Sequence, residues 1–190
     1  MGFVVAGGGS RRMGRDKALL PWNETTLLDH ALTRLRAVCA EVRILCGAER
    51  RYGDHNAPVD VDSIPGAGPL GGLLTGLERL QDSLGLFLAV DVPGVPVGVL
   101  HRLVALAPDH DVVVPVTTRG PEPLCAVYRS TCLEPVRRRL AGGQLKMTGF
   151  WADVRVREVT PAELDALGDA TVMFRNVNTP ADYGDLRPGR

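Results

Sequence analysis

Short, continuously apolar runs alternate with helical patterns from one end of the chain to the other. The run at 84–90 (LGLFLAV) is the most apolar of them, and the run at 3–6 (FVVA) is bounded by glycine. Strands without polar alternation are typical of a parallel sheet that is buried on both faces. The alternation therefore predicts an α/β fold with a mostly parallel central sheet, helices on both faces, and residues 84–90 at the sheet centre.

Local signals predict where the individual elements begin. Thr26 and Asp29 have the spacing of a capping box at a helix start, and Pro69 is well placed as the first residue of another helix. Apolar residues at helical spacing follow both positions. We expect helices at 27–38, 69–80, 96–106 and 132–140 and from Pro180 on, and strands at 3–6, 42–46, 59–61, 84–90, 112–116, 124–128 and 154–159.

Length and charge limit the classes of partner. A chain of 190 residues is the size of one α/β domain, so we expect a single domain over 1–190 with a frayed tail at 187–190. Lysine plus arginine and aspartate plus glutamate number 22 each, which favours neither nucleic acid nor a membrane as a partner. Without an apolar span or a leader pattern, we expect a cytoplasmic protein. The four cysteines lack C-x-x-C spacing and are interpreted as buried apolar side chains.

A segment rich in glycine and basic residues follows the first expected strand. The sequence AGGGSRRMGRDK at 6–17 places three glycines before Arg11, Arg12, Arg15 and Lys17. Glycines allow a turn in which successive N–H groups form a concave anion site, and the cations add charge to it. The spacing fits neither the dinucleotide fingerprint nor a P-loop. We interpret the segment as a phosphate-binding loop; a glycine turn with solvated arginines is the alternative.

A single carboxylate, Asp91, follows the most apolar run and precedes Val92-Pro93. Ligands of open α/β sheets bind beyond the carboxyl ends of the strands, and Mg²⁺ beside phosphates needs only one or two protein carboxylates. Asp91 is therefore a candidate Mg²⁺ ligand. The alternative is that it caps the turn into Pro93.

Asp62-Ser63 are expected at the same edge of the sheet, after the third strand. The segment SIPGAGPLGGLLTGL at 63–77 contains five glycines, which are costly in a helix unless a nucleobase or ribose approaches closely. The alternative for Asp62 is that its side chain only stabilises a turn. The alternative for the glycines, especially Gly76, is tight packing of the helix on the sheet.

Two asparagines stand near the C-terminal end. Asn176 and Asn178 are two positions apart, so their side chains project to the same side of an extended segment. Alternatively, Asn178 or Thr179 caps the final helix.

These motifs together resemble the molybdenum cofactor guanylyltransferase family. VAGGGSRRMGRDKALL at 5–20, Asp62-Ser63 with GPLGG at 68–72, Asp91-Val92-Pro93 and NVNTP at 176–180 occur in the family's order. The first motif indicates only the wider nucleotidyltransferase superfamily. The second and the last motif narrow the resemblance to the guanylyltransferase family. The resemblance implies a Rossmann-like nucleotidyltransferase fold and Mg²⁺-dependent transfer of GMP from GTP to the phosphate of the molybdenum–molybdopterin cofactor, with release of pyrophosphate.

The resemblance also implies residue roles. GTP would contact Val5, Ala6, Gly7, Gly8, Lys17, Asp62 and Asp91, with Lys17 on its phosphates and Mg²⁺ on Asp91. Asn176 and Asn178 would lie near the pterin. From the residues themselves we add Gly72 as a nucleotide contact and Arg12 beside Lys17 as a receiver of pyrophosphate. No nucleophilic side chain is needed, because the attacking phosphate is already an anion.

One position departs from the family pattern. Relatives can place an asparagine at the end of the second strand as a nucleotide contact, where this chain has Cys46-Gly47. Glu122, between two prolines, has no assigned role. Alternative functions are a sibling enzyme, such as a cytidylyltransferase for the same pterin or a sugar-phosphate nucleotidyltransferase, and a non-catalytic nucleotide-binding module. Retention of Lys17 and Asp91 argues against the module. Proteins that deliver and receive the cofactor are further expected partners.

Overall fold

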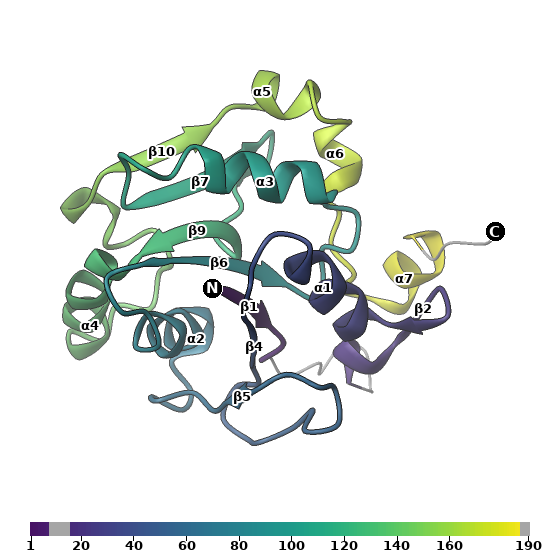
Figure 1. Cartoon of the computed structure of the whole chain (residues 1–190), viewed down its shortest axis with the longest axis horizontal. Coiled ribbons are helices and arrows are strands. Elements are labelled where there is room, and N and C mark those ends of the chain that lie inside the picture. Colours follow the sequence, from purple (N-terminus) through teal and green to yellow (C-terminus); the bar gives the residue numbers. More distant parts are fainter. Residues whose placement is uncertain (8–15, 187–190) are drawn as a thin grey trace.

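A central β-sheet with helices on both faces organises the protein (Figure 1). The computed structural model describes residues 1–7 and 16–186. The sheet contains β1 (Gly2–Val5), β4 (Val42–Leu45), β5 (Val59–Asp60), β6 (Leu84–Ala89), β7 (Val112–Thr117), β8 (Gly120–Pro121), β9 (Cys125–Arg129) and β10 (Val156–Val159), and β2 (Pro21–Trp22) pairs with β3 (Thr25–Thr26) in a separate hairpin. The helices are α1 (Leu27–Arg36), α2 (Gly68–Leu77), α3 (Val97–Ala105), α4 (Leu133–Ala141), α5 (Pro161–Asp165), α6 (Ala170–Met173) and α7 (Pro180–Leu186), with 3₁₀ turns at Lys17–Leu19, Ser130–Cys132 and Trp151–Asp153.

The sheet is mostly parallel. Its strands lie in the order β10–β7–β9–β6–β1–β4–β5, and β8 extends from β7 outside this path. Along the path, β9 is antiparallel to both of its neighbours, and the other adjacent pairs are parallel. The predicted fold class is confirmed, and the apolar run at 84–90 forms β6 in the middle of the order.

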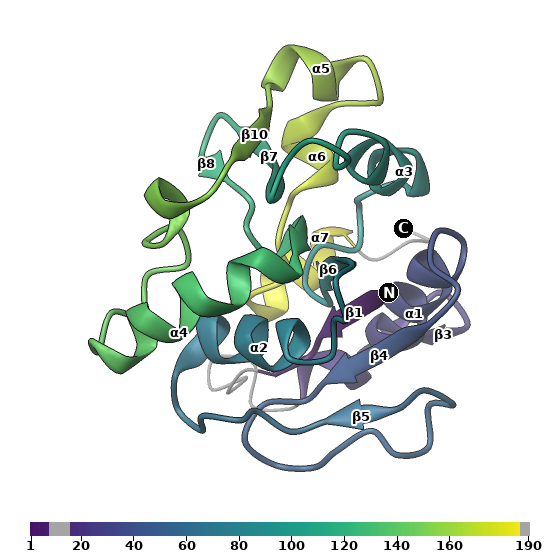
Figure 2. The same cartoon turned by 60° about the vertical axis from the view of Figure 1, so that its left-hand side comes forward.

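Helices cover the sheet in two pairs. α1 packs against α3 on one face, and α2 packs against α4 on the other (Figure 2). The predicted start of α1 is confirmed, because the Thr26 hydroxyl accepts the N–H of Asp29 at 3.1 Å. α2 begins at Gly68, one residue before the predicted start, so Pro69 lies in its first turn but is not its first residue. A Cβ on Gly76 would lie 2.5 Å from the Phe87 ring, so close packing of α2 on the sheet requires this glycine.

Several short elements were not expected from the sequence. They include the β2–β3 hairpin, the two-residue strand β8 and the short helices α5 and α6. Their two to five residues are too few for a periodic pattern to develop. The first four expected strands each end one residue earlier than predicted, at Val5, Leu45, Asp60 and Ala89.

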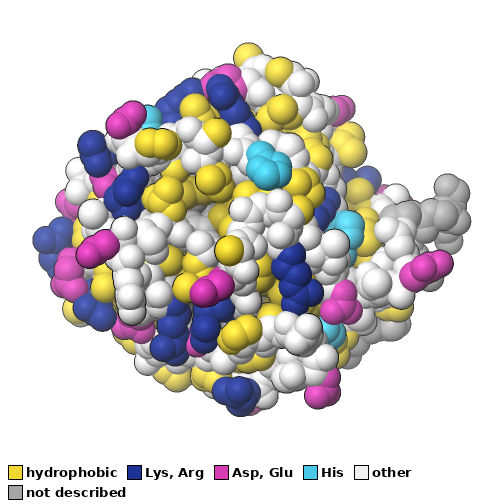
Figure 3. Space-filling model, viewed as in Figure 1, with side chains coloured by type: hydrophobic (Ala, Val, Ile, Leu, Met, Phe, Trp, Pro, Cys, Tyr) yellow, Lys and Arg dark blue, Asp and Glu magenta, His cyan; other side chains and the backbone are white. Residues whose placement is uncertain are grey.

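The surface charges and the cysteines agree with the expectations from composition. On the face seen in Figure 3, side chains of both charges are interspersed. Cys46, Cys125 and Cys132 are buried free thiols, and Cys39 is half-buried. Among the described helices, none has the length and apolar character needed to cross a membrane.

Candidate active site

The carboxyl ends of β1 and β6 form the centre of the site. Val5 pairs with Ala89 in the parallel register of these strands, and the N–H of Val90 donates to the carbonyl of Val5 at 3.2 Å. Asp91 is the next residue, so it emerges beside the start of the glycine-rich segment. The apolar character of β6 thus determines where the carboxylate leaves the sheet.

Lys17 meets Asp91 and Asn178 at this edge. Its Nζ donates to Asp91 Oδ2 at 3.2 Å and to Asn178 Oδ1 at 3.0 Å. The side chains of Lys17 and Asp91 are 17% and 23% exposed, which leaves both within reach of a ligand. Residues from three separate motifs therefore form one cluster.

Asp16 holds Lys17 in position. Its carboxylate caps the 3₁₀ turn by accepting the N–H of Ala18 at 3.1 Å. The same carboxylate accepts the Tyr52 hydroxyl at 2.8 Å and the Arg51 guanidinium at 3.0 Å, both from the connection between β4 and β5. Sequence reasoning missed this anchor, because no spacing signal links the two segments.

The NVNTP segment caps α7 and also brings Asn178 to Lys17. Thr179, not Asn178, caps α7: its hydroxyl accepts the N–H of Asp182 at 3.1 Å. The Asn178 side chain is therefore available for Lys17. Between the asparagines, Val177 is fully buried and donates its N–H to the carbonyl of Asp91 at 2.8 Å. This bond holds the segment against the end of β6.

The turn after Asp91 is also held from α1. Arg34 donates to the carbonyls of Val92 and Pro93, and Nε2 of His30 lies 3.2 Å from the Pro93 oxygen. Burial lowers the pKa of Arg34 to about 10, so the guanidinium stays charged at neutral pH. Burial and the charge of Arg34 lower the pKa of His30. Both residues position the turn, and neither showed a motif.

The start of the glycine-rich loop differs from the expected row of exposed amides. The N–H groups of Ala6 and Gly7 both donate to the Leu45 carbonyl, at 2.9 and 3.0 Å, because the chain continues alongside β4. They are therefore not free to bind phosphate. A Cβ on Gly7 would lie 2.7 Å from the nitrogen of Gly47, so a close backbone approach explains this glycine. Gly8 and Arg12 lie outside the described residues.

The departure at Cys46-Gly47 is explained by packing. Cys46 is fully buried, and its Sγ lies 3.2 Å from the carbonyl of Asp60. Gly47 has a φ of 81°, in the left-handed region that glycine and asparagine adopt most readily. The Cys46 side chain therefore points into the core and does not substitute for a nucleotide-binding asparagine.

Asp62 lies against the start of α2. Its carboxylate oxygens lie 3.9 Å from the positions that Cβ atoms on Gly71 and Gly72 would occupy. Asp62 Oδ1 is buried, and no hydrogen bond reaches it from the described residues. Burial raises the pKa of this carboxyl. An unpaired buried acceptor is costly, so a ligand that donates to it would be stabilised.

The glycines around α2 fall into three groups. Gly66, in the turn before α2, and Gly68, the first residue of the helix, have φ values of 82° and 62°. A Cβ on Gly71 would lie 2.9 Å from Ala67, and Gly76 packs on β6. A Cβ on Gly72 would meet only Asp62 Oδ1, at 3.9 Å, among the described residues outside its own helix backbone. Packing among the described residues therefore explains Gly71 and Gly76 but leaves space beside Gly72.

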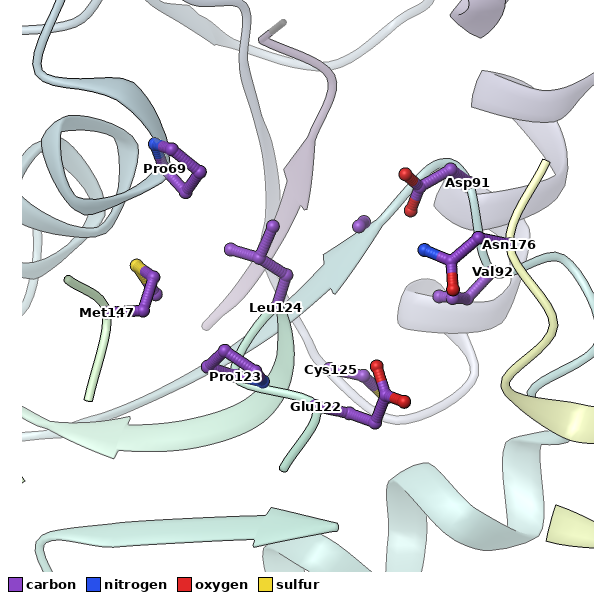
Figure 4. A pocket seen from close by; sticks show the side chains of 10 residues that line it. Pro69, Asp91, Val92, Glu122, Pro123, Leu124, Cys125, Met147 and Asn176 are labelled. Carbon is purple, nitrogen blue, oxygen red and sulfur yellow. The ribbon is translucent and has the colours of Figure 1, made fainter. Parts of the chain in front are cut away.

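A cavity of about 250 Å³ adjoins the Lys17 cluster. Asp91, Glu122 and Asn176 lie on one side of it, and apolar side chains including Pro69 and Met147 lie on the other (Figure 4). Burial raises the pKa of Glu122, although Arg119 and Thr117 oppose the shift. The site therefore has a charged part at Lys17 and Asp91 and a mainly apolar part that ends at Glu122.

Comparison with known proteins identifies the family. The model of the MobA-like NTP transferase domain matches residues 2–153, which is most of the chain. The protein belongs to the MobA-like nucleotidyltransferases. The resemblance to molybdenum cofactor guanylyltransferases is thereby confirmed.

Full-length relatives support this membership of the MobA-like family. A probable molybdenum cofactor guanylyltransferase of Carboxydothermus hydrogenoformans is 33% identical over 183 residues, which cover 96% of this chain and 92% of the relative. Another, of Pelotomaculum thermopropionicum, is 35% identical, with 98% and 91% covered. The fold matches the crystal structure of molybdopterin-guanine dinucleotide biosynthesis protein A of Archaeoglobus fulgidus with a TM-score of 0.83 at 22% identity, covering 98% of this chain and 96% of that one.

Proposed function

We propose that the protein transfers GMP from GTP to the phosphate of the molybdenum–molybdopterin cofactor and releases pyrophosphate. The observation that carries the proposal is the meeting of Lys17, Asp91 and Asn178, since these residues come from three of the four motifs by which the chain resembles guanylyltransferases. Relatives more than 30% identical carry this activity in their names.

The reaction joins two anions, so its main barrier is electrostatic. The acceptor phosphate attacks the α-phosphorus of GTP, the bond to the β-phosphate oxygen breaks, and pyrophosphate leaves. In this proposal Lys17 compensates charge on the phosphates, and the partial exposure of its side chain supports the role. Asp91 and Asn178 orient this ammonium by accepting two of its hydrogen bonds.

Asp91 fits the requirements of a Mg²⁺ ligand. Lys17 bonds to Oδ2, and no hydrogen bond reaches Oδ1 from the described residues. A carboxylate with a free oxygen, next to the place where phosphates would lie, is the protein contribution that Mg²⁺ needs. The chemistry that Mg²⁺ supplies there is alignment and charge compensation of the two anionic substrates.

Asp62 and Gly72 are candidates for nucleotide recognition. The unpartnered Oδ1 of Asp62 can accept a hydrogen bond from the base or the ribose, and the space beside Gly72 allows close approach. Selection of the nucleotide then depends on a buried acceptor and on backbone shape.

Pyrophosphate release tests the proposal. The purified protein is incubated with Mg²⁺, molybdopterin and each of the four nucleoside triphosphates in turn, with parallel reactions that lack molybdopterin. We expect release only with GTP and molybdopterin together. Release with CTP would make the protein a cytidylyltransferase. Nucleotide binding without release under any condition would make it a non-catalytic binding module.

A further inference from the structure

Glu122 lies in the cavity but outside the Lys17 cluster. Two hydrogen bonds hold its Oε1: from the Thr117 hydroxyl at 3.2 Å and from the Arg119 guanidinium at 3.3 Å. Arg119 also reaches Asn176 Oδ1 at 3.5 Å and the carbonyl of Phe174. Within the described residues, no hydrogen bond reaches Oε2. The carboxylate is thus fixed by one oxygen and can accept donors with the other.

The rest of the cavity suits a flat ring system. Pro69 and Met147 lie on the side opposite the polar groups, and Pro123 and Leu124 lie between the two sides (Figure 4). The methionine thioether makes favourable contacts with aromatic rings, and the proline and leucine side chains are apolar. The volume of about 250 Å³ is below the roughly 300–1,000 Å³ of sites for whole drug-sized ligands, so one ring system fits rather than a complete dinucleotide.

We propose that Glu122 determines acceptor specificity by accepting the paired N–H donors at the 2-amino-pyrimidinone edge of the pterin. A carboxylate has only acceptors, and the 2-amino group and N3–H of a pterin present two donors side by side. A ring bound by this edge against the apolar wall has its substituents free to extend toward Asp91 and Lys17. This inference rests on the proposed function.

Guanine has the same pair of donors on its own pyrimidine ring, so either the guanine of GTP or the pterin could donate to Glu122. We assign the Glu122 end of the cavity to the acceptor because the nucleotide has another candidate acceptor in Asp62 Oδ1, at the start of α2. Asn176, which the resemblance places near the pterin, lies on the Glu122 side of the cavity.

The test compares Glu122→Gln with Glu134→Gln, the same chemical change at a 70% exposed position on α4. Glutamine replaces one acceptor by a donor and keeps the size of the side chain. The ligands are 6-hydroxymethylpterin and 6-hydroxymethyllumazine, whose 2-oxo group replaces the 2-amino donor by an acceptor. Fluorescence titration gives the Kd of each, and pyrophosphate release gives the KM values for molybdopterin and GTP and the Mg²⁺ dependence.

We expect the wild-type protein and Glu134→Gln to prefer the pterin. Glu122→Gln should bind it about tenfold or more weakly, lose the preference over the lumazine, and show a raised KM for molybdopterin with an unchanged KM for GTP and unchanged Mg²⁺ dependence. A raised KM for GTP alone would assign Glu122 to guanine, and an altered Mg²⁺ dependence alone would make it a metal ligand. Either of these two results overturns the inference. It is also overturned if both variants bind the pterin equally or if the wild-type protein does not bind it. Wild-type release of pyrophosphate from GTP and molybdopterin tests the proposed function separately.

Discussion

Replacing Asp91 by asparagine is expected to abolish most nucleotidyl transfer while the protein stays folded. Asparagine has nearly the same size and keeps a side-chain oxygen, but it loses the charge that would hold Mg²⁺ beside the α-phosphate. Removing a group that stabilises charge in the transition state typically costs a factor of about 10²–10³ in turnover. We expect a loss of at least this size.

The effect on stability should be much smaller. The Lys17–Asp91 pair is one 3.2 Å contact between side chains that are 17% and 23% exposed, and such pairs contribute about 1 kcal/mol or less. For a chain of 190 residues this corresponds to a fall in Tm of about 2–4 °C. Lys17 keeps its 3.0 Å bond to Asn178, so GTP affinity should change less than turnover.

The assay is pyrophosphate release as a function of Mg²⁺ concentration, with a thermal melt of each protein. Asp165→Asn is the matched control, because this exposed aspartate lies on α5, away from the site. Near-wild-type rates with unchanged Mg²⁺ dependence in Asp91→Asn would refute the reasoning and leave Asp91 as a turn cap.

Three further predictions concern other parts of the molecule. Lys17→Ala should weaken GTP binding by about 1.5–3 kcal/mol in calorimetry with little change in Tm, and wild-type affinity would contradict its role. Gly72→Val should block GTP binding with a native circular dichroism spectrum, whereas Gly76→Ala should destabilise the fold because its Cβ would lie 2.5 Å from Phe87; normal GTP binding by the first variant would refute the nucleotide contact. Although burial opposes the shift, hydrogen bonds from Arg155 lower the pKa of the Asp111 carboxyl from 3.8 to about 2. The ionised carboxylate therefore stabilises the fold at pH values above its pKa in the unfolded chain. Asp111→Asn should therefore lower the free energy of unfolding by about 2 kcal/mol at neutral pH, and this difference should shrink in urea titrations as the pH falls from about 4 to about 2; a constant difference would contradict the linkage.

The sequence by itself determined the longer helices and strands and which of their ends carry candidate site residues. Thr26 caps α1 through a contact three positions away and Pro69 lies in the first turn of α2, so a local pattern reports both. The apolar run of β6 reflects burial on both faces, which is why its central place could be predicted. The choice of Asp91 as a candidate Mg²⁺ ligand then rests on the rule that ligands bind beyond the carboxyl ends of the strands.

Only the tertiary structure decided which side chains meet. Lys17 lies 74 positions from Asp91 and 161 from Asn178, and their contact depends on the order of the strands. The packing of Gly7 on Gly47 depends on the register of β1 and β4. This packing is the reason why the expected free amides are missing at the described start of the loop. No local pattern carries this information, because such contacts arise when distant segments of the chain pack against one another.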